Sequence, residues 1–221
     1  MNLTLTAADG VELHAYLALP EGTPRGAVIV VQEIFGVNVH IRDVCDRFAA
    51  EGYAAIAPAI FDRIEPGFEA GYTEPEIAKA RGFVPKLDFD DVMRDVDAAR
   101  AAVAEHGKVG IVGFCLGGSV AFLAGARLEG ISAASCYYGR LIRDFADEAP
   151  KCPTQLHYAG IDSSIPPENY EEVRAKRPDA EFFLYEGVHH GFNCDRRDSF
   201  DADAARRAWS RTTTLFAQSV G

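Results

Sequence analysis

Residues Lys108–Gly118 have the sequence KVGIVGFCLGG, which joins an apolar run to a glycine-rich turn and the start of a further apolar segment. The pattern predicts a short buried strand, a sharp turn and an apolar helix. Cys115 lies at the turn, between Gly113 and Gly117. Glycine has no Cβ, so both flanking positions allow the strand and helix backbones to approach closely. The segment therefore predicts a thiol held clear of a sheet at a strained strand-to-helix connection.

The Gly-x-Cys-x-Gly spacing matches the nucleophile elbow of hydrolases, with cysteine in place of the usual serine. A helix N-terminus behind Cys115 would also favour a thiolate over a thiol. The alternative is a packing role, because cysteine is among the most buried residue types. The glycines and the strand-then-helix context favour a nucleophile, provided that a base and an acid follow in the appropriate order.

Length and composition favour one α/β domain spanning residues 1–221. The chain has 48% hydrophobic and 25% charged residues, which is ordinary for a globular protein. Its formal net charge of −11 argues against nucleic acid or an anionic membrane as a partner. We expect a small-molecule substrate and a monomer or small homo-oligomer.

The five cysteines are odd in number and include no Cys-x-x-Cys pair. The N-terminal MNLTLTAADG has no basic region before an apolar run. No stretch approaches the roughly 20 apolar residues of a membrane span. These features predict a cytoplasmic protein with free thiols, which suits a catalytic cysteine.

Strands and helices alternate after an N-terminal hairpin, so the sequence predicts an α/β fold with a mostly parallel sheet and helices on both faces. The predicted hairpin pairs 2–6 with 11–19 around an Asp-Gly turn. Further strands are predicted at 27–31, 54–60, 131–138, 153–158 and 181–185, and helices at 40–50, 88–106, 166–177 and 201–219.

The segment from about 61 to 87 interrupts this alternation with several prolines and glycines. A helical turn is expected near Glu74–Arg81. An excursion of this length is often a lid or a substrate-binding segment. A surface loop without a role is the equal alternative.

Two residues follow Cys115 in the order nucleophile, acid, histidine that hydrolases of this type use. Asp162 and His190 each come after a predicted strand, so both loops should meet Cys115 at the carboxyl edge of the sheet. Taken alone, Asp162 could be a turn or helix-capping residue. His190 is preferred over His189 because Gly191 permits close approach. A zinc site at the adjacent histidines is disfavoured, because no cysteine or carboxylate cluster has ligand spacing.

The sequence resembles the dienelactone hydrolase family of the α/β-hydrolase fold. The matching segments are QEIFGVN at 32–38, GFCLGG at 113–118, YYG at 137–139, GIDSSIP at 160–166 and HGF at 190–192. The resemblance implies hydrolysis of a lactone or small ester through an acyl-thioester on the cysteine, with no cofactor and no metal.

The resemblance also assigns roles to individual residues. It makes Cys115 the nucleophile, His190 the base and Asp162 the group that orients the imidazole. Glu33 matches a glutamate that contacts the resting thiol and helps to form the thiolate when substrate arrives. The expected oxyanion hole consists of the backbone N–H groups of Ile34 and Leu116.

The sequence departs from the family pattern at Cys194, where enzymes that act on dienelactone carry an arginine. Dienelactone itself is therefore not predicted as the substrate. Candidate substrate contacts are Arg81, Arg140, Tyr137 and Phe35, although surface solvation of the arginines and core packing of the tyrosine are common alternatives. An esterase or thioesterase of other specificity, and a non-catalytic thiol sensor or binding module, remain alternative functions.

Overall fold

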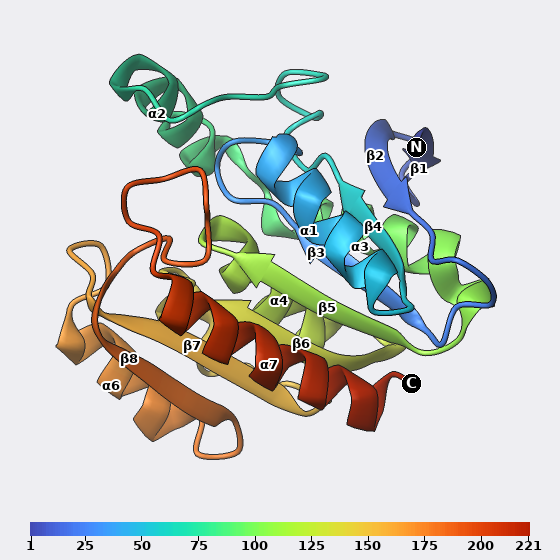
Figure 1. The fold of residues 1–221 in the computed structure, drawn as a ribbon. Coiled ribbons are helices and arrows are strands. Elements are labelled where there is room, and N and C mark those ends of the chain that lie inside the picture. The colour runs from blue at the N-terminus through green and yellow to red at the C-terminus, as the bar shows by residue number, and fades with distance from the viewer.

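In a computed structural model, residues 1–221 form an eight-stranded sheet with helices on both faces (Figure 1). The order of the strands across the sheet is β1-β2-β4-β3-β5-β6-β7-β8. The strands are β1 Asn2–Thr6, β2 Glu12–Ala18, β3 Ala27–Val31, β4 Ala54–Pro58, β5 Val109–Phe114, β6 Ile131–Tyr137, β7 Thr154–Ile161 and β8 Glu181–His189. The predicted α/β fold with a mostly parallel sheet is confirmed.

The first two strands pair antiparallel, and β2 also runs antiparallel to β4. All remaining neighbours are parallel. Parallel strands covered on both faces need apolar side chains throughout. Accordingly β3, β4 and β5 are buried at every position, whereas β1 alternates at the edge of the sheet. The carboxyl ends of the parallel strands thus converge on one edge.

The helices are α1 Val39–Ala50, α2 Glu74–Arg81, α3 Phe89–Val103, α4 Leu116–Arg127, α5 Ile142–Phe145, α6 Pro167–Lys176 and α7 Ala202–Ser219. Helices α1 and α7 lie together on one face of the sheet, and α3 and α4 cover the other (Figure 1). Phe48 of α1 packs on Trp209 of α7, with ring centroids 4.5 Å apart. This contact fastens the two helices over the core.

The excursion at 61–87 contains more regular structure than the sequence indicated. Helix α2 has eight residues rather than one turn, and a short 3-10 helix follows at Val84–Lys86. The side chain of Glu76 accepts from the backbone N–H of Thr73 and makes a capping box that fixes the start of α2. Phe61, Phe68 and Phe83 pack together beneath the segment and attach it to the core. A lid-like motion, like the single-domain organisation, stays a prediction.

Strand β8 also runs further than the sequence indicated, ending at His189 instead of Tyr185. Gly187 lies at a φ of 75° within it, and the pairing with β7 shifts register nearby. His190 is consequently the first residue beyond the strand. No helix combines the length and the apolar character that crossing a membrane requires.

Candidate active site

Cys115 lies between the end of β5 and the start of α4 and adopts a φ of 54°. Only one other non-glycine residue, Tyr138, has a positive φ. Such a conformation is costly for an L-residue and persists only where its surroundings enforce it. The Cys115 N–H donates to the carbonyl of Tyr137 over 3.0 Å, which anchors the turn to β6. The geometry is that of a nucleophile elbow.

The surrounding glycines allow this turn for a specific steric reason. A Cβ on Gly113 would lie 1.8 Å from the Gly117 carbonyl oxygen, and one on Gly117 would lie 2.3 Å from that of Val31. A Cβ on Gly118 would lie 2.3 Å from the Tyr137 carbonyl oxygen. Since these obstacles are backbone atoms, no side-chain movement could relieve the clashes.

The three predicted triad residues meet at the carboxyl edge of the sheet. Asp162 directly follows β7 and His190 directly follows β8. His190 Nδ1 lies 2.6 Å from Asp162 Oδ2, and the aspartate is buried. Cys115 and His190 line the same cavity. This arrangement orients the imidazole with its Nε2 free for a reacting partner.

The pKa of His190 reflects two opposing influences. Burial disfavours the charged imidazolium, but negative charge on Cys115 and the Asp162 carboxylate outweighs it and raises the pKa to about 10. A protonated His190 beside the sulfur is thus the favoured state at neutral pH. An imidazolium at this position can donate a proton to a leaving group.

The predicted oxyanion donors also border this cavity. Ile34 and Leu116 both line it. Leu116 is the first residue of α4, so its N–H has no acceptor within the helix. The Ile34 N–H, in the turn after β3, has no backbone acceptor either. Two free donors at the cavity wall could hold a developing oxyanion.

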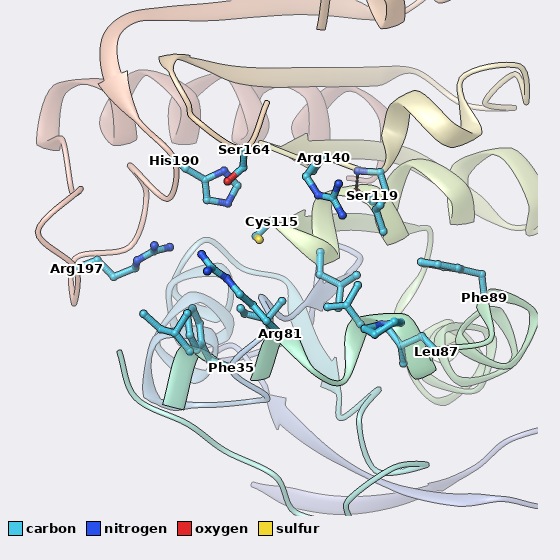
Figure 2. A pocket seen from close by; sticks show the side chains of 16 residues that line it. Phe35, Arg81, Leu87, Phe89, Cys115, Ser119, Arg140, Ser164, His190 and Arg197 are labelled. Carbon is cyan, nitrogen blue, oxygen red and sulfur yellow. Dashed lines mark hydrogen bonds between the residues drawn. The ribbon is translucent and has the colours of Figure 1, made fainter. Parts of the chain in front are cut away.

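The cavity has a volume of about 750 Å³ (Figure 2). The segment at 61–87 supplies a large part of its wall, including Ile77, Val84 and Leu87. Phe35 lines it as well, in agreement with its place among the candidate contacts. The wall is therefore largely apolar, as in most small-molecule sites.

Three arginines interrupt this apolar wall. In the view of Figure 2, Arg81 and Arg197 lie on one side of Cys115 and Arg140 lies on the other. Arg81 and Arg140 are exposed and pair with no carboxylate of the chain. Two unpaired guanidinium groups in the cavity of Cys115 suit an anionic group on a ligand.

The third arginine, Arg197, pairs with Glu33, its guanidinium 3.4 Å from the carboxylate. Glu33 is 1% exposed, and its Oε2 has no hydrogen-bond partner. The structure contains no hydrogen bond between Glu33 and the Cys115 thiol, so the expected contact with the resting nucleophile is replaced by this ion pair. Arg197 was missed as a site residue because it lies seven positions beyond His190, in a loop whose path the sequence does not indicate.

Of the two adjacent tyrosines, the structure brings Tyr138 rather than Tyr137 to the site. Tyr137 is fully buried, and its hydroxyl lies 2.8 Å from Thr212 Oγ1 of α7. The Tyr138 ring packs on the His190 ring at 4.9 Å between centroids. Tyr137 is therefore not retained as a substrate contact.

Cys194, at the position of the expected arginine, is buried and lies outside the cavity. Its Sγ lies 3.3 Å from the Tyr72 hydroxyl. Gly191, at a φ of 81°, makes room for Arg197, because a Cβ there would lie 2.4 Å from a guanidinium nitrogen. The loop after His190 thus turns Cys194 inward and brings Arg197 to the cavity.

Comparison with known proteins agrees with this fold. The model of the dienelactone hydrolase family matches residues 13–220. A Synechocystis protein provisionally named as a carboxymethylenebutenolidase is 37% identical, covering 94% of this chain and 92% of its own. A Yersinia pestis protein of the same provisional name is 36% identical, covering 97% and 87%.

Solved structures give the same result. A crystal structure provisionally identified as a dienelactone hydrolase from Klebsiella pneumoniae has a TM-score of 0.86 and 32% identity, covering 99% of this chain and 98% of its own. A dienelactone hydrolase-like promiscuous phosphotriesterase from metagenomic libraries has a TM-score of 0.82 at 21% identity, covering 100% and 99%, and shows the shared fold alone.

The fold is thus that of the α/β-hydrolases. Within that class, the chain belongs to the dienelactone hydrolase family, whose members are hydrolases acting on ester bonds.

Proposed function

We propose that this protein hydrolyses a small ester or lactone that carries a carboxylate, with Cys115 as the nucleophile. The observation that carries the proposal is the position of Cys115 on the elbow, in one cavity with His190 and three arginines. His190 is oriented by Asp162 across 2.6 Å. Nucleophile, base, orienting acid and oxyanion donors are all accounted for by this chain.

The reaction would proceed in two halves. The Cys115 sulfur forms a bond to the carbonyl carbon, and the ester C–O bond breaks as the alkoxide leaves with a proton from His190. A water molecule then gives a proton to His190 and attacks the thioester carbonyl, and the C–S bond breaks with the Cys115 thiolate as the leaving group. The carboxylic acid product ionises by giving its proton to the solvent. The N–H groups of Ile34 and Leu116 stabilise the oxyanion in both halves, and loss of one such donor typically costs roughly 10²–10³ in rate.

Glu33 supplies a link between substrate binding and nucleophile activation in this proposal. A substrate carboxylate that binds Arg197 competes with Glu33 for the guanidinium, 3.4 Å away. The released Glu33 carboxylate could then take a proton from a Cys115 that is still in its thiol form. Only substrates with an anionic group would trigger this step.

A second candidate keeps the mechanism but takes neutral esters or thioesters as substrates. The apolar wall formed by Ile77, Val84 and Leu87 favours it, because an uncharged acyl or alcohol group would bury well there. The ratio of kcat/KM for cis-dienelactone to that for a neutral aryl ester separates the two candidates. A ratio well below one would favour the neutral substrates.

The test is mass spectrometry of protein quenched seconds after mixing with p-nitrophenyl acetate or with cis-dienelactone. We expect an acyl adduct on Cys115 that decays on standing and is absent from Cys115→Ala. Cys152→Ala is the matched control, because Cys152 is a half-buried thiol outside the cavity. A protein that turns over neither substrate and is oxidised at Cys115 without acylation would instead support the thiol sensor.

A further inference from the structure

A second group of reactive side chains lies next to the active site and has no part in the proposed mechanism except through Glu33. Glu33 follows β3, His40 lies in α1, and Cys194 lies in the loop after β8. One ligand atom from each lies within 4.8 Å of the others. All three side chains are buried, at 1%, 0% and 0% exposure.

Three polar atoms of this group lack hydrogen-bond partners. Neither ring nitrogen of His40 has a hydrogen bond, and neither does Oε2 of Glu33. Buried polar atoms without partners are rare and cost free energy. The nearest carboxylate oxygen to His40 Nδ1, that of Asp195, lies 3.7 Å away, beyond hydrogen-bond distance. The two ring nitrogens of His40 and Oε2 of Glu33 therefore indicate that this group binds a ligand.

The donor set suits a zinc ion. Thiolate sulfur, imidazole nitrogen and carboxylate oxygen are the three ligand types that Zn²⁺ takes in proteins, often with a fourth position left for water. Tetrahedral Zn²⁺ with its usual bond lengths separates ligand atoms by roughly 3.4–3.7 Å. Side chains with donor atoms within 4.8 Å of one another need to contract by only about 1 Å.

Charge also favours a divalent ion. A Cys194 thiolate and the Glu33 carboxylate together carry the two negative charges that Zn²⁺ neutralises. Glu33 directs Oε1 toward Arg197, whereas Oε2 has no partner. One carboxylate can thus face the arginine and the ion with different oxygens.

Access to this group does not pass through the catalytic cavity. A separate surface hollow of about 410 Å³ is lined by His40, Tyr72 and Asn38, among others. It shares no residue with the cavity at Cys115. Tyr72 lies 3.3 Å from the sulfur of Cys194. An ion could therefore enter between Tyr72 and His40.

We propose that Glu33, His40 and Cys194 form a binding site for Zn²⁺. Binding forms Zn–S, Zn–N and Zn–O bonds, and the thiol proton of Cys194 passes to the solvent. The site was invisible in the sequence because residues 33, 40 and 194 show no ligand spacing. As a consequence that rests on the proposed function, the ion occupies the free oxygen of Glu33, so that this carboxylate cannot take the proton of Cys115 and turnover falls.

Binding is tested in a Cys115→Ser background, which removes the other thiol and histidine pair able to bind metal. Co²⁺ is the probe, because a thiolate ligand gives it a charge-transfer absorption band. We expect one Co²⁺ per chain with this band, displaced by Zn²⁺. Adding Cys194→Ser or His40→Gln should weaken Co²⁺ binding by more than roughly 10–100-fold. That range is the typical cost of losing a residue that only hydrogen-bonds to a metal ligand. Adding Cys152→Ser, the matched control, should leave Co²⁺ binding unchanged.

A Cys115→Ser protein with no thiolate band, or one whose band survives Cys194→Ser, would overturn the proposal. Circular dichroism checks that each variant is folded. His40→Gln and Cys194→Ser each remove a different proposed ligand, so the two variants test the site independently. Inhibition is measured separately, as the fold-loss of cis-dienelactone turnover on adding Zn²⁺, because this substrate carries the carboxylate on which the Glu33 step depends. We expect at least 10-fold loss in the wild type and a smaller loss in Cys194→Ser. Binding without inhibition would overturn the role given to Glu33 and not the site.

Discussion

The guanidinium of Arg197 lies 3.4 Å from the buried carboxylate of Glu33, although 164 residues separate the two along the chain. The pair connects the loop after β8 to the turn after β3, and both segments border the cavity of Cys115. A buried carboxylate with a single cationic partner makes the stability of the fold depend on that partner, because its removal leaves an uncompensated charge.

Replacement of Arg197 by glutamine should therefore lower stability. Arg197 is 23% exposed, so the expected loss in the free energy of unfolding is about 1–3 kcal/mol, less than for a fully buried pair. Adding Glu33→Gln should recover part of the loss, since the buried charge is then gone. Urea denaturation of the wild type, the two single variants and the double variant forms a double-mutant cycle, which measures the interaction free energy between Arg197 and Glu33.

Arg196→Gln is the control for this cycle. Arg196 is the neighbouring residue, half exposed, and pairs with Asp43 at the surface. Its replacement should change stability by less than about 1 kcal/mol. Equal losses for Arg196→Gln and Arg197→Gln would contradict a special role for the buried pair.

Arg81 should decide between anionic and neutral substrates. It lines the cavity without a carboxylate partner, so its charge is available to a substrate. Arg81→Gln should raise KM for a carboxylate-bearing ester about 10-fold, the effect of roughly 1.4 kcal/mol. KM for a neutral ester of the same size should change less than about 2-fold.

Arg94 provides the comparison, being a partly exposed arginine of α3 outside the cavity. Steady-state kinetics of Arg94→Gln should match the wild type with both esters. If Arg81→Gln raised KM for both esters by the same factor, Arg81 would shape the cavity rather than recognise charge.

The stability of the protein should depend on His190 below about pH 10. Its pKa is raised from the usual 6.5 to about 10, because Cys115 and Asp162 outweigh the effect of burial. A raised folded-state pKa contributes stability that is complete below the unfolded pKa and is lost as pH rises through the folded value. The difference in unfolding free energy between wild type and His190→Gln should thus shrink as the pH rises from about 6.5 to about 10.

Asp162→Asn makes this test specific. Without the carboxylate 2.6 Å from Nδ1, the pKa of His190 should fall, and the loss of stability should be complete at a lower pH. Denaturation at a series of pH values gives the two midpoints. Coincident midpoints for wild type and Asp162→Asn would show that Asp162 does not support the imidazolium.

Much of the site followed from the sequence because its residues lie directly after strands. Strand ends are predictable from apolar runs, and parallel strands bring their carboxyl ends together, so the sequence alone groups Cys115, Asp162 and His190. It does not group Arg197 with them, because the position of that residue depends on the path of a loop. The sequence likewise left Tyr137 as either a pocket residue or a core residue, because its contact with Thr212 of α7 depends on how that helix packs on the sheet.

The elbow supplies the sharpest stability prediction. A Cβ on Gly118 would meet the Tyr137 carbonyl oxygen at 2.3 Å, whereas one on Gly82 would have 3.2 Å to the Lys79 carbonyl oxygen. Gly82 also has a helical φ of −66°, which alanine readily adopts. Gly118→Ala should lower the free energy of unfolding by more than about 2 kcal/mol, and Gly82→Ala by less than about 1 kcal/mol.

The same clash should also lower the reactivity of Cys115. The Tyr137 carbonyl accepts the hydrogen bond from the Cys115 N–H that holds the strained turn, so moving it away from Gly118 disturbs the nucleophile as well. Folded Gly118→Ala should therefore be acylated more slowly by p-nitrophenyl acetate than Gly82→Ala. If Gly118→Ala were as stable and as rapidly acylated as Gly82→Ala, close backbone packing would not be what holds Cys115 in its reactive conformation.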